Sequence, residues 1–151
     1  MLDAKTMLEL VEEIKKDEGA VVENERHVAY ADSEGYWTIG IGRLIDSKLP
    51  GAGLRDNEVE QMLQNDLAEC VSDLEKTFPW FNDLPALAKK ALCNMRFNVG
   101  MPRLKKFEKM LNALETGQFE WAAEECLDSR WSKQVGARSE RIAELYRSCA
   151  T

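Results

Sequence analysis

The sequence predicts an α+β fold with a small N-terminal lobe, a long connecting helix, a larger all-helical C-terminal lobe and a cleft between the lobes. Two observations carry this prediction. Between residues 21 and 42, β-branched and aromatic residues occur in short runs separated by turn residues, which is typical of a small three-stranded antiparallel sheet. From residue 56 onward, apolar residues recur at helical spacing between Gly and Pro breaks. At 151 residues we expect one domain over 1–151, with lobe 1 at about 15–55 and the helical lobe at 77–151.

A charged amphipathic helix is predicted at residues 6–17. Its apolar residues recur at helical spacing: Met7, Leu10, Val11 and Ile14. Thr6 or Asp3 can cap its start, and Gly19 supplies a stop. We expect this helix to pack on the helical lobe and to place Glu18 at its last turn.

Three short runs predict the strands, at residues 21–22, 27–30 and 36–39, with the sheet ending near Ile41. Because side chains alternate along a strand, Thr38 shares a face with Tyr36, and Trp37 points to the other side. Residues 46–53 are rich in Gly, Ser and Pro and predict a loop.

The connecting helix is predicted at 56–76, where the apolar periodicity is the cleanest in the chain. At 1.5 Å per residue it spans about 30 Å. Asp56 is its expected N-cap, and Arg43 is a candidate ion-pair partner for Asp66 on this helix, although a simply exposed arginine fits as well. An aromatic corner at 78–81 ends the helix. Shorter helices are predicted at 85–98, 103–115, 119–127, 129–133 and 138–147.

The charge is uneven along the chain. The net charge is −7 overall; residues 1–84 hold 8 basic and 19 acidic side chains, whereas residues 85–151 hold 12 and 8. Overall acidity argues against a nucleic-acid partner, because neutralising phosphates requires clustered basic charge. A basic cluster can still attract an anionic wall polymer or be a solvated helical face. Its members are Lys89, Lys90, Arg96, Arg103, Lys105, Lys106 and Lys109.

The first residues have no uninterrupted apolar segment, so no signal peptide is expected, and no stretch is long enough to span a bilayer. We therefore expect a cytoplasmic protein with no stable membrane association. The four cysteines lack C-x-x-C spacing, which favours reduced, mostly buried thiols: Cys70, Cys93, Cys126 and Cys149. His27 is the single histidine, so a zinc site is not expected, and we assign His27 no catalytic role.

Two carboxylates, Glu18 and Asp32, are predicted at element ends, where a small sheet can hold them and leave them open to a cleft. Such a pair is what acid–base chemistry on a sugar bond requires. The carbonyl end of a helix disfavours negative charge, which suits a proton donor at Glu18. The alternative is that Glu18 is a surface acid and that Asp32 only forms a turn.

Three blocks together resemble one family. The first is Glu18-Gly19 followed by Tyr30-x-Asp32-x-x-Gly35-x-x-Thr38-Ile39-Gly40-Ile41-Gly42. The second is Asn94-Met95-Arg96-Phe97-x-x-Gly100, and the third is Ala122-Ala123 followed by Ser129-Arg130-Trp131-x-x-Gln134-x-x-x-Arg138-x-x-Arg141. In this order and over this length, they resemble the T-even phage lysozyme family of muramidases. The first block is specific, and the other two are weak by themselves.

The resemblance implies roles for single residues. Glu18 is the implied acid, Asp32 the carboxylate that activates water, and Thr38 the residue that positions this water. The implied substrate contacts are Gly42, Leu44, Phe97 and Arg138, the last of which is also placed to reach Glu18. The chain departs from the family pattern in a longer hairpin, whose extra residues fall at the 23–26 tip. It also departs at Met110 and Glu125, where smaller or neutral polar residues are expected.

The implied function is an endolysin that cuts the β-1,4 bond between N-acetylmuramic acid and N-acetylglucosamine in peptidoglycan, by inversion and without a metal or organic cofactor. We expect a monomer that acts on glycan strands and depends on a separate holin-type protein to reach the wall. Two alternatives stay open. One is a wall-binding module that has lost catalysis, and the other is a helical interaction protein in which the first block is accidental.

Overall fold

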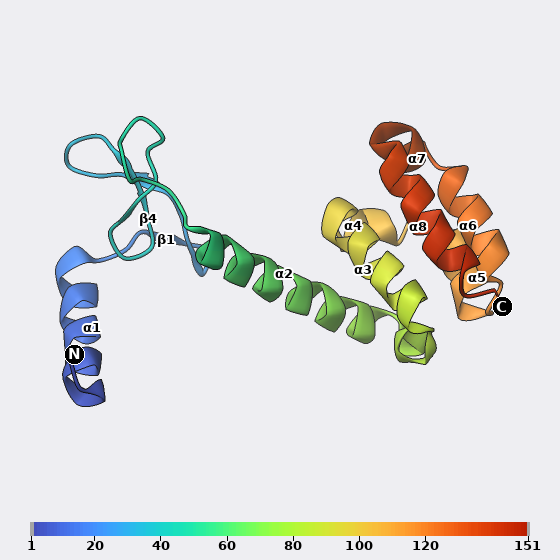
Figure 1. The fold of residues 1–151 in the computed structure, drawn as a ribbon, viewed down its shortest axis with the longest axis horizontal. Helices are drawn as coiled ribbons and strands as arrows, with labels where there is room; N and C mark the ends of the chain where they lie inside the picture. The colour runs from blue at the N-terminus through green and yellow to red at the C-terminus, as the bar shows by residue number, and fades with distance from the viewer. Residues whose placement is uncertain (1, 151) are drawn as a thin grey trace. The chain divides into compact units, whose positions relative to one another are not determined.

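The computed structural model describes residues 2–150 and confirms the α+β class. The chain divides into two compact units, of which the first ends at Val59 and the second begins at Glu60. The first unit holds helix α1 (Ala4–Glu18) and all strands of the described chain, and the second holds the helical core (Figure 1). The predicted cleft and the packing of residues 6–17 on the helical lobe stay predictions.

Helix α1 begins where Asp3 caps it. The Asp3 carboxylate accepts a hydrogen bond from the Thr6 backbone N–H at 3.0 Å, which satisfies one of the free donors at the helix start and lowers the pKa of Asp3. The helix ends at Gly19, whose φ of 66° is open to glycine at little cost and whose N–H bonds the Lys15 carbonyl. Glu18 is therefore the last helical residue.

The sheet has three antiparallel strands, but their positions differ from the prediction. Residues 27–30 do not form one strand, because Arg26–His27 and Tyr30–Ala31 belong to different strands, and Arg43–Leu44 was not predicted as a strand. Strand β3 (Tyr30–Ala31) pairs with β4 (Trp37–Ile39), and β4 pairs with β5 (Arg43–Leu44). Residues 21–22, expected as a sheet strand, lie instead in or beside a separate hairpin of β1 (Val22–Glu23) and β2 (Arg26–His27). The chain reverses after β4 because Gly40 and Gly42 adopt positive φ values of 62° and 68°, which brings β5 back beside it.

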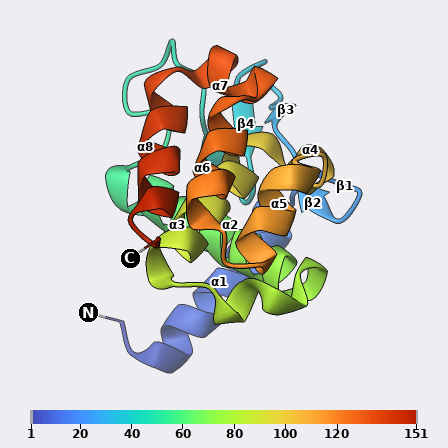
Figure 2. The ribbon, with the colours of Figure 1, turned by 90° about the vertical axis from the view of Figure 1, so that its right-hand side faces the viewer.

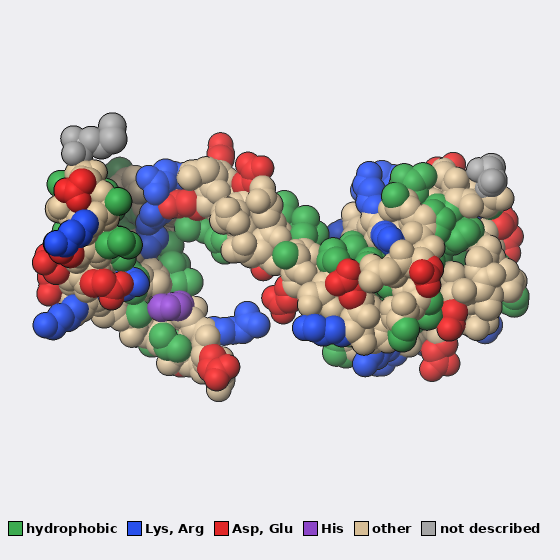
Figure 3. Space-filling view, turned by 90° about the horizontal axis from the view of Figure 1, so that it is seen from below, with side chains coloured by type: hydrophobic (Ala, Val, Ile, Leu, Met, Phe, Trp, Pro, Cys, Tyr) green, Lys and Arg blue, Asp and Glu red, His purple; other side chains and the backbone are tan. Residues whose placement is uncertain are grey.

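The longer hairpin turns at its expected tip. Asn24 and Glu25 both have positive φ, at 49° and 63°, as a two-residue hairpin turn requires. His27 follows on β2 and is exposed (Figure 3). Residues 46–53 form the predicted loop without regular structure.

Helix α2 (Asp56–Thr77) runs across the boundary between the two units, one residue longer than predicted. The expected N-cap is wrong by one position, because Asp56 is already helical. The helix start is capped instead by Glu58. Its carboxylate accepts a hydrogen bond from the Arg55 backbone N–H at 2.8 Å, as the third residue of a capping box does. Asp56 still lies in the first turn, where negative charge is favourable.

The second unit packs short helices around one core. After the 3-10 turn η1 (Pro79–Asp83) come α3 (Ala86–Val99), α4 (Met101–Leu104), α5 (Glu108–Glu115), α6 (Phe119–Leu127), α7 (Arg130–Val135) and α8 (Ala137–Arg147). Figure 2 shows α6 between α5 and α8. Tyr146, Met95 and Leu114 are among the fully buried side chains, and Phe81 of the aromatic corner joins them. The apolar spacing of 85–98 and 119–127 also predicts Leu87 and Trp121 in the helical core, but both are exposed.

The helix predicted at 103–115 is interrupted. Helix α4 ends at Leu104 and α5 begins at Glu108, with tight turn bonds from the Lys106 and Phe107 N–H groups to the Arg103 and Leu104 carbonyls. The interruption lets Phe107 pack edge-to-face on Trp131, with the ring centroids 6.2 Å apart. The tertiary contact therefore overrides the helix preference of the intervening lysines.

Candidate active site

The first unit contains a cavity of about 310 Å³ that collects five of the residues predicted for the site. They come from the end of α1, from the sheet and from the turn between β4 and β5: Glu18, Asp32, Thr38, Gly42 and Leu44. Separate elements thus bring two carboxylates and a hydroxyl to the lining of one open cavity.

Asp32 is fixed by the turn that it opens. Its Oδ1 accepts from the backbone N–H groups of Glu34 at 2.9 Å and Tyr36 at 2.8 Å. The Asp32 N–H in turn donates to the Tyr36 carbonyl at 2.8 Å. These bonds all use Oδ1 or the backbone, and among residues 2–150 no hydrogen bond reaches Oδ2. The turn therefore orients the carboxyl group and leaves one oxygen for a ligand or water.

Thr38 lies in the middle of β4 with its side chain turned inward. It is 5% exposed, whereas Trp37 is 54% exposed, which confirms the predicted alternation. The Thr38 Oγ1 donates to the Tyr36 carbonyl at 3.3 Å. Since this bond uses the hydroxyl proton, the oxygen keeps its lone pairs for a water that donates to it.

Glu18 packs against the backbone of Gly42. A Cβ atom built on Gly42 would lie 2.8 Å from Glu18 Oε2 and 3.1 Å from its carboxyl carbon. A side chain at position 42 would therefore occupy the space of the Glu18 carboxyl group. Glycine is required here twice, by this close approach and by its positive φ.

The wall beside Gly42 is held by an ionic cluster on the far side of β5. Arg43 donates to Glu58 at 2.7 Å, and a second guanidinium nitrogen lies 2.6 Å from the same carboxylate. Arg55 also binds Glu58, at 2.6 Å. The Gly53 N–H bonds the Leu44 carbonyl at 3.0 Å, so the loop after β5 is tied to the strand that lines the cavity.

Glu58, rather than the predicted Asp66, is thus the partner of Arg43. The hydrogen bonds from Arg43 and Arg55 hold the pKa of Glu58 far below its ordinary value of 4.5. The hydrogen bond to Glu58 and the negative charge of Glu58 raise the pKa of Arg43. Glu58 is therefore a carboxylate at every pH at which the protein would be expected to work.

Sequence reasoning missed four residues that also line the cavity: Tyr30, Glu34, Tyr36 and Leu49. Tyr30 pairs with Thr38 across the sheet, and this register was not visible without the position of β3. Glu34 is a third carboxylate at the cavity, two residues beyond Asp32. Its position in the Asp32 turn was the available signal.

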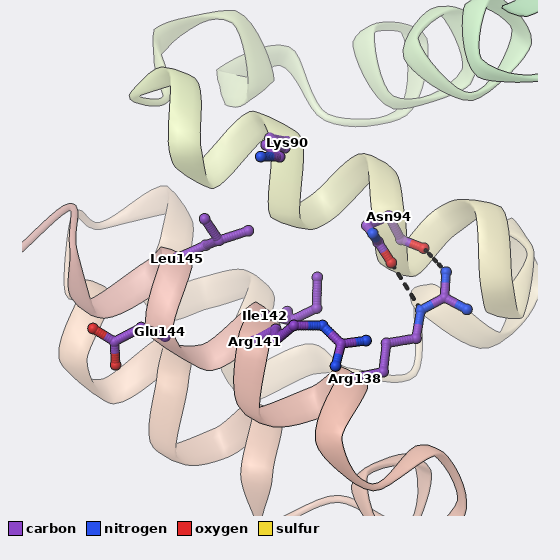
Figure 4. Close-up of a pocket in the computed structure, with 7 residues that line it drawn as sticks. All are labelled: Lys90, Asn94, Arg138, Arg141, Ile142, Glu144 and Leu145. Carbon is purple, nitrogen blue, oxygen red and sulfur yellow. Dashed lines mark hydrogen bonds between the residues drawn. The ribbon is translucent and has the colours of Figure 1, made fainter.

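Phe97 and Arg138 belong to the second unit. Phe97 is 43% exposed near the end of α3. Arg138 lines a cavity of about 560 Å³ between α3 and α8, where its Nε donates to Asn94 Oδ1 at 2.9 Å (Figure 4). The contacts expected of both residues with substrate, and of Arg138 with Glu18, stay predictions.

The two positions at which the chain departs from the family pattern, Met110 and Glu125, have distinct environments. Met110 is buried in the core of the second unit. The Glu125 carboxylate accepts from the Trp121 indole N–H at 2.9 Å and lines a neighbouring cavity of about 280 Å³.

The cysteines are unpaired, and Cys70 and Cys126 are buried. Burial raises the pKa of Cys126 to about 12. Within residues 2–150, no three His, Cys, Asp or Glu side chains are grouped to hold a metal ion. None of the helices in that range combines the length and the apolar character needed to cross a membrane.

Comparison with known proteins gives consistent matches. Residues 20–147 match the sequence profile of the family described as phage lysozyme. The chain is 28% identical over 158 aligned positions to probable T4-type lysozyme 2 of Dictyostelium discoideum, covering 88% of this chain and 90% of the relative. It is 30% identical over 167 positions to the pre-baseplate central spike protein Gp5 of Enterobacteria phage T4, covering 95% of this chain and 28% of that protein.

Proposed function

Because the chain belongs to the phage lysozyme family, we propose that it hydrolyses the β-1,4 glycosidic bond between N-acetylmuramic acid and N-acetylglucosamine in peptidoglycan. The observation that carries the proposal is the cavity shared by Glu18, Asp32 and Thr38. Enzymes that cut glycosidic bonds use a pair of carboxyl groups flanking the bond, and this pair is present.

In the proposed reaction, protonated Glu18 donates its proton to the glycosidic oxygen as the bond from the anomeric carbon to that oxygen breaks. Asp32, through the oxygen that the turn leaves open, takes a proton from a water whose oxygen bonds the anomeric carbon. The second hydrogen of this water is directed to Thr38 Oγ1, whose own proton is held by the Tyr36 carbonyl. Proton exchange with solvent restores Glu18 and Asp32.

The proposed reaction inverts the anomeric configuration. Inversion needs the attacking water between the substrate and the second carboxylate, which requires a carboxyl separation of roughly 6.5–9.5 Å. The arrangement of Asp32 and Thr38 supports a water-activating role, because both present an acceptor to the cavity. Both proton-transfer groups belong to the chain, so the proposal includes no cofactor.

We further propose that the protein is a monomeric endolysin that acts on glycan strands at the end of phage infection. It would stay in the host cytoplasm until a holin-type protein opens a path to the wall. This role has no nucleic-acid partner and no stable membrane association. Its support is the family together with the acidity of the chain, whose net charge is −7.

The test is the turbidity of permeabilised Gram-negative cells after addition of purified protein. We expect the natural protein to clear the suspension and Glu18→Gln to be inactive while still folded by circular dichroism. The matched control is Glu13→Gln, on the same helix but outside the cavity, which should clear like the natural protein. Wall binding without clearing would favour the binding module, and neither binding nor clearing would favour the interaction protein.

A further inference from the structure

A second cavity of about 310 Å³ lies on the helical unit, at the interruption between α4 and α5. It is lined by Arg103, Lys106, Phe107, Ser129, Arg130 and Trp131. Three of these six residues are cations, two from the contiguous stretch 103–106 and one from the start of α7, and none is an acid. The cavity lies in the part of the chain, residues 85–151, in which basic side chains outnumber acidic ones by 12 to 8.

The three cations have no carboxylate partner. Within residues 2–150, salt bridges engage Arg43, Arg55, Arg96 and Arg147, but none engages Arg103, Lys106 or Arg130. The Arg103 guanidinium instead donates to the neutral Gln134 side chain at 3.4 Å. All three side chains are exposed, so solvent screens their charges, and each is available to pair with a bound anion.

The aromatic floor of this cavity is rigid. Trp131 is buried and donates its indole N–H to Asn98 Oδ1 at 2.7 Å, and Phe107 packs edge-to-face on it. Arg130 directly precedes Trp131, and Lys106 directly precedes Phe107. The fixed rings therefore fix the backbone from which two of the cations extend, which lowers the entropy lost when a ligand binds.

Acids lie next to this cavity. Glu108, Glu125 and Asp128 line an adjacent cavity, which shares Lys106, Phe107 and Ser129 with this one. The Glu125 carboxylate is already bonded to the Trp121 indole N–H.

We propose that this cavity binds a phosphoryl group, in the form of a phosphate monoester or inorganic phosphate dianion. Arginine forks bind phosphate oxygens in pairs, and lysine adds a point charge. A dianion matches three cations better than a single carboxylate does. The cavity, of about 310 Å³, has room for a phosphoryl group with part of its carrier. The binding is independent of glycan hydrolysis.

The experiment is a titration of the full chain with inorganic phosphate, followed by amide NMR shifts at residues 103–107 and 129–131, with sodium chloride at matched ionic strength as the reference. We expect saturable shifts with phosphate only. Arg130→Gln and Lys106→Gln should each weaken binding about tenfold or more. Lys76→Gln removes one exposed charge of the same helical unit outside the cavity and should leave binding unchanged.

Equal shifts with chloride, no saturation, or equal weakening by Lys76→Gln would overturn the proposal. The folded state of each variant is read from the same spectra. A second arm uses vesicles with and without phosphatidic acid. Vesicle binding that requires phosphatidic acid and Arg130 identifies a lipid phosphate as the source, whereas phosphate titration without vesicle binding identifies a soluble phosphate compound.

Discussion

The contact between Gly42 and the Glu18 carboxyl group predicts a specific result for the Gly42→Ala substitution. The new Cβ would lie 2.8 Å from Glu18 Oε2, about 0.6 Å inside ordinary van der Waals contact at 3.4 Å. The carboxyl group or the turn must therefore move. A shift of this order in a reacting group can lower kcat by about 100-fold. Alanine at positive φ also costs roughly 1–2 kcal/mol of folding free energy.

Gly40→Ala is the matched control. Gly40 belongs to the same turn and has a φ of 62°, against 68° for Gly42, but no atom lies within 4 Å of its built Cβ. Both variants should lose about 1–2 kcal/mol of unfolding free energy in urea titrations. Only Gly42→Ala should lose hydrolysis rate on purified peptidoglycan. Equal activity of the two variants would refute the reasoning that the Glu18 carboxyl group works from its place against Gly42.

Three further predictions concern single side chains. Because the folded-state pKa of Glu58 lies below its ordinary 4.5, the stabilisation from Glu58 is complete above that pH and is lost as pH falls. Glu58→Gln should therefore lower Tm at pH 7, and its Tm should approach that of the natural protein at pH 3. The same difference in Tm at both pH values would contradict this. Thr38→Val keeps the side-chain shape but removes the acceptor for water, so it should lower kcat about 100-fold with little change in KM. An unchanged kcat would exclude the proposed role of Thr38 in positioning the water. With a pKa of about 12, Cys126 is a thiolate in roughly one molecule in ten thousand at pH 8. In an alkylation time course followed by mass spectrometry, Cys126 should therefore react after the half-buried Cys149. Equal alkylation rates of the two thiols in the folded protein would contradict the burial of Cys126.

Local sequence signals located most of the candidate catalytic cavity. Glu18 precedes a helix-stopping glycine, Asp32 opens a turn, and Thr38 alternates with Trp37, so each position follows from neighbouring residues. The roles proposed for these residues rest on the family resemblance as well as on this placement.

Features that depend on residues far apart in the sequence could not be predicted from local sequence signals. Strand β5 has two residues, one of them charged, and shows no alternation, so only its pairing with Trp37–Ile39 reveals it. Glu58 and Asp66 are eight residues apart and lie on similar faces of α2. The choice between them as the partner of Arg43 depends on where the 46–53 loop places β5.

The interrupted helix shows the same limit. Lysines at 105 and 106 favour a continuous helix, and no local break signal stands there. The packing of Phe107 on Trp131, 24 residues away in sequence, decides the conformation. The phosphoryl site proposed at this interruption therefore had no complete signature in the sequence, although Arg103 and Lys106 were part of the basic cluster.

The anomeric configuration of the first product tests the central claim most directly. The substrate is a defined muropeptide whose single cleavable β-1,4 bond runs from N-acetylmuramic acid to N-acetylglucosamine. It is hydrolysed in an NMR tube, and the anomeric signals of the product are followed before mutarotation. With Glu18 as acid and Asp32 and Thr38 directing water from the opposite face, the α-anomer should appear first. Initial formation of the β-anomer would contradict the account, as would the absence of cleavage by the folded protein.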